Sequence, residues 1–214
     1  MDSKLEIMAQ GDLDRANEKS RKRKAARDKM LAEKTVEKGL LIIHTGKGKG
    51  KSTAAFGLVF RALGNGMRVG IIQFVKGKWE TGERYALEKF GAQVETKAMG
   101  EGFSWDTQDK ARDIRAAEAA WAQAVTWIEA CEGPNPQFDM ILLDELNIPL
   151  RYDNLPIDQI VKTLANKPRD LHIIITGRNA KDELIEIADL VTEMGQIKHP
   201  FREQNVKAQK GIEF

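Results

Sequence analysis

Residues 40–53 read "LLIIHTGKGKGKST", an apolar run followed by a stretch in which three glycines alternate with three lysines. The apolar run has the length and composition of a strand that is buried on both faces of a sheet. Glycines let the backbone N–H groups of a turn approach an anion, and lysines add positive charge there. A strand, then this turn, then a helix is the local pattern of a loop that holds the phosphates of a nucleotide.

The candidate phosphate loop departs in one place from the usual pattern G-x-x-x-x-G-K-[ST]. Five positions before Gly50 stands Thr45, and Gly46 is one residue too close, so we expect a loop whose start is shortened or reshaped. Lys51 would bring a point charge to the phosphates, and the Ser52 hydroxyl would be a ligand of Mg²⁺. A flexible basic turn without a ligand is the alternative interpretation. The residues expected to bind the nucleotide are Thr45, Gly46, Lys47, Gly48, Lys49, Gly50, Lys51, Ser52 and Thr53.

Strands and helices alternate through the rest of the chain. Strands are expected at 39–45, 68–75, 92–99, 138–145 and 170–178, and helices at 51–66, 77–91 (after a loop), 106–131, 156–168 and 181–194, the last running into a final strand. This alternation predicts an α/β fold. We expect the P-loop NTPase-like (RecA-like) form, with a mostly parallel sheet flanked by helices.

Two acidic residues, Asp144 and Glu145, end the apolar run "MILLDE" at 140–145. Ligands of open parallel sheets bind at the carboxyl ends of the strands, so these acids are candidate ligands of the metal ion that accompanies the phosphates. Which of the two touches the metal stays open, and both could instead cap the following turn. Arg178 ends another predicted strand and is a candidate phosphate ligand, with a surface arginine or a contact to a partner subunit as alternatives. The near miss "NKPRD" (166–170) is not a GTP-type N-K-x-D motif, so ATP is favoured.

The bulk composition excludes several classes of protein. The chain has a net charge of only +2, which does not point to nucleic acid as a partner. One cysteine and three dispersed histidines exclude a disulfide framework within the chain and a zinc spacing. Neither an apolar signal region nor a membrane-length apolar stretch is present, so we expect a soluble, cytoplasmic protein without membrane contact.

The N-terminal residues 1–38 form a basic arm that we expect to be separate from an α/β domain at 39–214. Residues 15–29 carry eight Lys and Arg against two Asp and Glu, and no broad apolar stripe would dock them. The composition allows a frayed or disordered arm, or a mobile helix that closes over a ligand or a neighbouring subunit. A patch for nucleic acid or a membrane is the third interpretation.

The segment "GEGFSWDTQ" (100–108) is glycine-rich and holds two large aromatics, Phe103 and Trp105, in an expected loop. Such aromatics are often part of the core. They could also form an apolar wall for a large, flat ligand.

With this segment, the chain resembles the P-loop type of ATP:corrinoid adenosyltransferase from about Gly39 to its C-terminus. The resemblance rests on "TGKGKGKSTAAFG" (45–57), "GIIQFVKGKWETGE" (70–83), "GFSWDTQ" (102–108), "ILLDELN" (141–147), "IIITGRNA" (173–180), "IKHPF" (197–201) and "VKAQKGIEF" (206–214). The shortened start of the phosphate loop is similar to that of the family. The arm matches only in being basic and charged.

The resemblance implies transfer of the 5′-deoxyadenosyl group from ATP to the reduced cobalt of cob(I)alamin or cob(I)yrinic acid a,c-diamide, with release of triphosphate, in adenosylcobalamin biosynthesis. It implies catalytic roles for Lys51, Phe103 and Trp105, with the two aromatics excluding water and the lower cobalt ligand. It also implies Mg²⁺, with Mn²⁺ as the other suitable ion, at Ser52 and Glu145, with Asp144 beside them. The implied partners are ATP, a reduced corrinoid, an electron-donating reductase and a second copy of the chain in a homodimer.

Two other functions remain open from the residues alone. A P-loop kinase or ATPase would transfer or hydrolyse the terminal phosphoryl group and yield ADP rather than triphosphate. A non-catalytic nucleotide or corrinoid carrier would bind without turnover.

Overall fold

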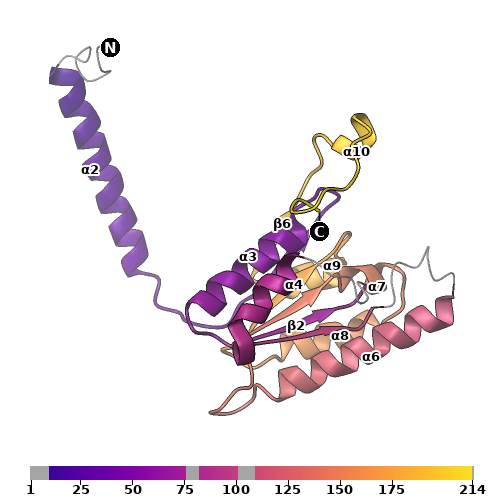
Figure 1. Ribbon diagram of the computed structural model, residues 1–214. Coiled ribbons are helices and arrows are strands. Elements are labelled where there is room, and N and C mark those ends of the chain that lie inside the picture. The colour runs from indigo at the N-terminus through magenta and orange to yellow at the C-terminus, as the bar shows by residue number, and fades with distance from the viewer. Residues whose placement is uncertain (1–9, 76–81, 101–108, 214) are drawn as a thin grey trace. The chain divides into compact units, whose positions relative to one another are not determined.

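The computed structural model describes residues 10–75, 82–100 and 109–213 (Figure 1). The chain divides into two compact units, with the boundary between Glu37 and Lys38. Phe103 and Trp105 lie outside the described residues. Among the helices of the described part, none is long and apolar enough to cross a membrane.

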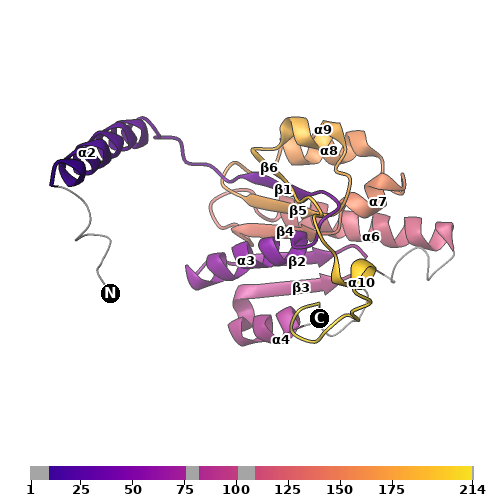
Figure 2. The same cartoon turned by 90° about the horizontal axis from the view of Figure 1, so that it is seen from above.

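The second unit is built on a six-stranded sheet in the order β3-β2-β4-β5-β1-β6 (Figure 2). Every pair of neighbouring strands is parallel. The strands are β1 (Leu41–Thr45), β2 (Val69–Gln73), β3 (Val94–Ala98), β4 (Met140–Asp144), β5 (His172–Thr176) and β6 (Leu190–Glu193). The predicted α/β fold with a parallel sheet is therefore confirmed.

Helices cover both faces of this sheet (Figures 1 and 2). One face carries α3 (Lys51–Gly64) and α4 (Gly82–Leu87), whose apolar side chains form one core cluster with the sheet. The opposite face carries α6 (Lys110–Glu129), α7 (Asn147–Arg151), α8 (Ile157–Ala165) and α9 (Asp182–Ile187) over the larger cluster. A 3₁₀ helix, η1 (Glu88–Gln93), follows α4, and a short helix, α10 (Pro200–Glu203), follows β6. The sequence did not predict α7 and α10, because helices this short show no apolar periodicity.

The register of the strands brings four polar residues into one row at the carboxyl end of the sheet. Gln73 on β2 is paired with Asp144 on β4, and His44 on β1 is paired with Thr176 on β5. The last pair of β4 and β5, Leu143 with Ile175, makes Asp144 and Thr176 neighbours as well. Residues two positions earlier on these strands pack in the cluster beneath α3. Because side chains alternate along a strand, the row lies on the face of the sheet that α3 covers.

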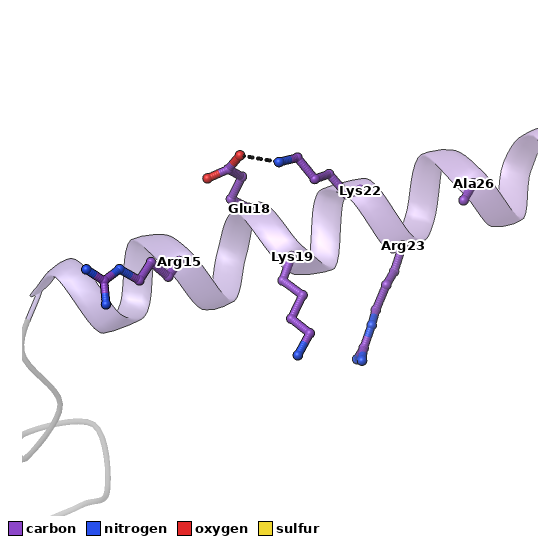
Figure 3. Close-up of a pocket in the computed structure, with 6 residues that line it drawn as sticks. All are labelled: Arg15, Glu18, Lys19, Lys22, Arg23 and Ala26. Atoms are coloured by element: carbon purple, nitrogen blue, oxygen red, sulfur yellow. Dashed lines mark ion pairs between the residues drawn. The ribbon is translucent and has the colours of Figure 1, made fainter.

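The first unit contains the helix α2 (Gln10–Ala32). Apart from Leu13, the side chains of residues 11–32 are exposed. Figure 3 shows Lys19 and Arg23 projecting from one side of α2, while Glu18 and Lys22 form an ion pair on another. Residues Gln10–Ala32 are therefore helical, and the role of the arm stays a prediction. The shallow concave patch drawn in Figure 3 is lined by residues of this single helix alone.

Candidate active site

The glycines of the phosphate loop are required by the backbone that lies against them. Gly46 and Gly50 have φ values of 97° and 104°, in the left-handed region that favours glycine. A Cβ atom on Gly46 would lie 2.5 Å from the carbonyl oxygen of Met194, and one on Gly48 would lie 2.6 Å from that of Gly195. The loop therefore runs directly beside the residues that follow β6, with no room for side chains at either position.

Hydrogen bonds between the loop and its neighbours explain why Thr45 stands where the usual pattern has glycine. The N–H of Met194 donates to the carbonyl of Thr45 (2.9 Å), and the N–H of Gly48 donates to the carbonyl of Met194 (2.7 Å). The Thr45 hydroxyl accepts the N–H of Ala180 (3.0 Å). Thr45 is thus the last residue of strand β1, and the turn begins at Gly46.

Lys51 is the first residue of α3, and its side chain is folded back under the loop. The residue is only 7% exposed, and its Nζ donates to the carbonyl of Gly48 at 2.5 Å. Burial lowers the Lys51 pKa, nearby Glu145 raises it, and the positive charges of Arg178 and Lys49 lower it further. Two further cations and one carboxylate therefore act on Lys51 at the positive end of a helix, an arrangement that suits a polyanion.

The two acids at the end of β4, Asp144 and Glu145, have different surroundings. Asp144 is fully buried, and its two oxygens accept hydrogen bonds from the Thr176 hydroxyl (2.8 Å) and the Gln73 amide (3.2 Å). Glu145 is half-buried, has a left-handed backbone with φ 65°, and donates its N–H to the Thr176 hydroxyl (2.8 Å). Asp144 is thus held by protein donors, whereas the carboxylate of Glu145 lies within electrostatic reach of Lys51.

Space for the Glu145 carboxylate comes from Gly177, which follows β5 with a φ of 126°. A Cβ atom on Gly177 would lie 3.2 Å from Oε2 of Glu145 and 2.8 Å from Cβ of Asn147. The buried side chain of Asn147 donates to the carbonyl of Gly177 (3.0 Å) and keeps the two segments together. The ends of β4 and β5 therefore form one packed unit around Glu145.

The oxygen donors at this end of the sheet fit a magnesium ion. Ser52 lies next to Lys51 at the start of α3 and is half-exposed, so its hydroxyl and the Glu145 carboxylate are hard oxygen ligands of the kind that Mg²⁺ prefers. Residues 10–75, 82–100 and 109–213 contain no group of three or more His, Cys, Asp and Glu that could hold a metal by itself. This is compatible with Mg²⁺, which keeps several waters and is commonly completed by substrate phosphates.

The other predicted nucleotide ligands lie at the solvent side of the loop. Lys49 forms an ion pair with Glu213, which brings the C-terminal segment to the loop. Lys47, Thr53 and Arg178 are exposed. His44, one residue before Thr45, is buried, and in the described part of the chain its two ring nitrogens have no hydrogen-bond partner. Burial lowers the His44 pKa, so the ring is neutral.

Sequence reasoning missed Thr176, Gln73 and the loop's contact with Met194. The motif "TGR" (176–178) drew attention to its arginine, although a threonine that ends a buried strand beside an acidic strand end was the signal for a hydrogen bond. The partners of Gln73 and Met194 gave no sequence signal, because they depend on which strands are neighbours in the sheet.

A parallel sheet with a glycine–lysine loop after β1 and acids at the end of β4 defines a P-loop α/β protein that binds a nucleotide. The family model of the ATP:corrinoid adenosyltransferase BtuR/CobO/CobP matches residues 37–214. The chain belongs to this family. Membership makes it a transferase of cobalamin biosynthesis with ATP and a corrinoid as substrates.

Individual relatives agree with this assignment. A corrinoid adenosyltransferase of Sinorhizobium sp is 51% identical over 211 residues, which cover 98% of this chain and 96% of the relative. One of Pseudomonas aeruginosa is 44% identical and covers 94% of this chain and 96% of the relative. The crystal structure of the RadB recombinase is similar with a TM-score of 0.46 and 11% identity, covering 77% of this chain and 78% of that chain, which is too distant for any conclusion.

Proposed function

We propose that the chain transfers the 5′-deoxyadenosyl group of ATP to the cobalt(I) ion of a reduced corrinoid and releases inorganic triphosphate. The observation that carries this proposal is the surroundings of Lys51, where Lys49 and Arg178 add positive charge at the N-terminus of α3. A leaving triphosphate gains negative charge as its bond to carbon breaks, so donors fixed at this point would stabilise the transition state.

In the proposed reaction, cobalt(I) supplies an electron pair to C5′ of the ribose, the Co–C bond forms, and the C5′–O bond breaks. The electron pair of that bond leaves with the triphosphate. No proton moves, so the reaction needs no general base, which agrees with a neutral, buried His44 beside the loop. The chain's own contribution is to bind the triphosphate through residues 45–53 and Arg178, with Lys51 at its centre.

A divalent metal ion, Mg²⁺ or alternatively Mn²⁺, would add positive charge to the phosphates when bound. We assign its direct protein ligands to Ser52 and Glu145. Asp144 would not bind the metal ion directly, because its oxygens already accept hydrogen bonds from Thr176 and Gln73. This assignment predicts that Asp144→Asn and Glu145→Gln differ, with the larger loss of metal affinity for Glu145→Gln.

The corrinoid side of the site is proposed from the sequence. Phe103 and Trp105 would wall off the cobalt from water and from its lower ligand, which eases reduction to cobalt(I). The Phe103→Ala, Trp105→Ala double variant should then lose adenosylation while its ATP affinity stays within about threefold, because the phosphates are bound elsewhere. An equal loss of ATP binding would show that the pair is structural.

Further parts of the proposal concern partners and organisation. A reductase supplies the electron, a homodimer is the expected assembly, and the cytoplasm is the expected location. Residues 39–214 would be the catalytic domain, and residues 1–38 a basic arm. The physiological corrinoid is either cob(I)yrinic acid a,c-diamide or cob(I)alamin.

The test is an anaerobic mixture of the protein, ATP, Mg²⁺ and a chemically reduced corrinoid, followed by the visible spectrum and by the phosphate products together. A light-sensitive alkylcobalt spectrum with one triphosphate per corrinoid is expected. ADP and orthophosphate with an unchanged corrinoid would instead indicate a kinase or ATPase, and binding of both ligands without products would indicate a carrier.

A further inference from the structure

The hydroxyl group of Thr176 connects the two acids at the end of β4, Asp144 and Glu145. It donates to Oδ1 of Asp144 at 2.8 Å and accepts the backbone N–H of Glu145 at 2.8 Å. Thr176 and Asp144 are both fully buried, so water does not compete for these bonds. One hydroxyl therefore fixes the side chain of the first acid and the backbone of the second.

The backbone of Glu145 has an unfavourable conformation that hydrogen bonds must stabilise. Its φ of 65° lies in the left-handed region, which is unfavourable for a residue with a side chain. In this conformation the Glu145 N–H donates to Thr176, and the Glu145 carbonyl accepts the Ile148 N–H (3.0 Å). Without the hydroxyl, Glu145 would be free to relax to negative φ, and its carboxylate would leave the position beside Gly177.

Other polar neighbours do not duplicate this role. Gln73 reaches only the other oxygen of Asp144, at 3.2 Å. Asn147 holds the carbonyl of Gly177, on the β5 side of the contact, at 3.0 Å. The Thr176 hydroxyl, in contrast, bonds to the side chain of Asp144 and to the backbone of Glu145.

We propose that Thr176 is a positioning residue that sets the metal affinity of the ATP site by holding Glu145 in its left-handed conformation. The inference rests on the proposed function, in which Glu145 is a direct ligand of the metal ion that accompanies ATP. Thr176 itself touches neither the metal nor the nucleotide. Its effect should therefore appear in metal binding and in kcat, and should be absent from ATP binding without metal.

The test compares four variants of the full chain with the wild type. Thr176→Val keeps the shape and removes the hydroxyl, and Thr176→Ser keeps the hydroxyl. Gln73→Met removes a hydrogen bond to Asp144 alone. Ile174→Val, on the same strand and face, is the control for a small packing loss. Should Thr176→Val fail to fold, Thr176→Ala removes the hydroxyl without adding bulk and carries the same prediction.

Mn²⁺ is the probe, because its free concentration in the presence of ATP can be followed by electron paramagnetic resonance. Thr176→Val should weaken Mn²⁺ binding about tenfold and lower kcat by a similar factor, as the loss of a buried hydrogen bond to a charged network predicts. Calorimetric ATP affinity in EDTA should stay within about twofold, and Thr176→Ser, Gln73→Met and Ile174→Val should keep Mn²⁺ affinity within about threefold.

Two results would overturn the inference. One is wild-type Mn²⁺ affinity in Thr176→Val, and the other is an equal loss in Thr176→Ser or Ile174→Val, which would reveal a general packing effect. Failure of the proposed function has a different signature, because the wild type itself would then release no triphosphate.

Discussion

The buried Lys51 and the half-buried Lys167, at opposite ends of the sheet, show how the same side chain serves different purposes. Lys167 donates to the carbonyls of Gly39 (2.8 Å) and Leu171 (2.7 Å), and more weakly to that of Pro168 (3.4 Å). Lys51 donates to the single carbonyl of Gly48. Burial is the largest cause of a lowered pKa at both lysines.

The charged neighbours distinguish the two lysines. Near Lys167, Asp189 acts against the lowering of the pKa by burial, and Lys38 pairs with Asp189. Near Lys51, the carboxylate of Glu145 raises the lysine pKa, and the positive charges of Arg178 and Lys49 lower it. Surplus positive charge beside left-handed glycines indicates an anion site, whereas a lysine with several carbonyl acceptors indicates a structural crosslink.

The largest expected effect is at Lys51. Lys51→Met should lower kcat by about 10²–10³-fold, as the loss of one preorganised donor to a developing anion does elsewhere. Its melting temperature should not fall, because the variant removes a buried charge that has one hydrogen bond. Single-turnover kinetics and calorimetric melts check both parts, and an unaffected kcat would contradict the assignment of Lys51 to the leaving triphosphate.

The second-largest expected effect is a loss of ATP affinity on substitution of Gly46. A methyl group there meets the Met194 carbonyl at 2.5 Å with φ at 97°, so Gly46→Ala should displace the loop and weaken ATP binding about tenfold or more. The matched control is Gly57→Ala on α3, where a Cβ meets nothing within 4 Å. This control should keep ATP affinity and add about 0.5–1 kcal/mol of stability. Equal ATP affinities of the two variants would show that the loop can move away without cost.

Lys167→Met should lower the stability and leave kcat unchanged, the opposite of what we expect for Lys51→Met. The carbonyls that Lys167 bridges would lose a charged donor, so we expect the free energy of unfolding to fall by about 2 kcal/mol. Urea denaturation measures this loss. The kcat of the folded enzyme should be unchanged, and a loss of activity without a loss of stability would place Lys167 in the site.

The smallest effect concerns Asp189, whose pKa is lowered chiefly by the hydrogen bond from Lys38 and then by the N–H of Leu41. A lowered pKa in the fold means that this stabilisation is present above about pH 4 and is lost as the pH falls through the folded value. Asp189→Asn should remove it, at a cost below about 1 kcal/mol because the pair is exposed to solvent. Urea denaturation should show a larger difference between wild type and variant at pH 6 than at pH 3.

The sheet could be predicted from the sequence because each buried strand is a continuous apolar run, and the phosphate loop because its spacing is local. The bond between Thr176 and Asp144 could not, because it joins residues 32 apart in the chain through the adjacency of β4 and β5. The left-handed Glu145 carries no sequence signal, since glutamate rarely adopts that conformation. The sequence places Lys167 only near the end of the expected helix at 156–168, because its carbonyl partners include Gly39, 128 residues away.

The most direct measurement of the central claim asks which bond of ATP breaks. ATP labelled with ¹⁸O at the oxygen between C5′ and the α-phosphorus would be turned over once with reduced corrinoid, and the products analysed by mass spectrometry. The account predicts that the label leaves entirely in triphosphate, with C5′ bound to cobalt. Label in adenosine, or in ADP beside unlabelled orthophosphate, would mean that a P–O bond breaks and would contradict adenosyl transfer.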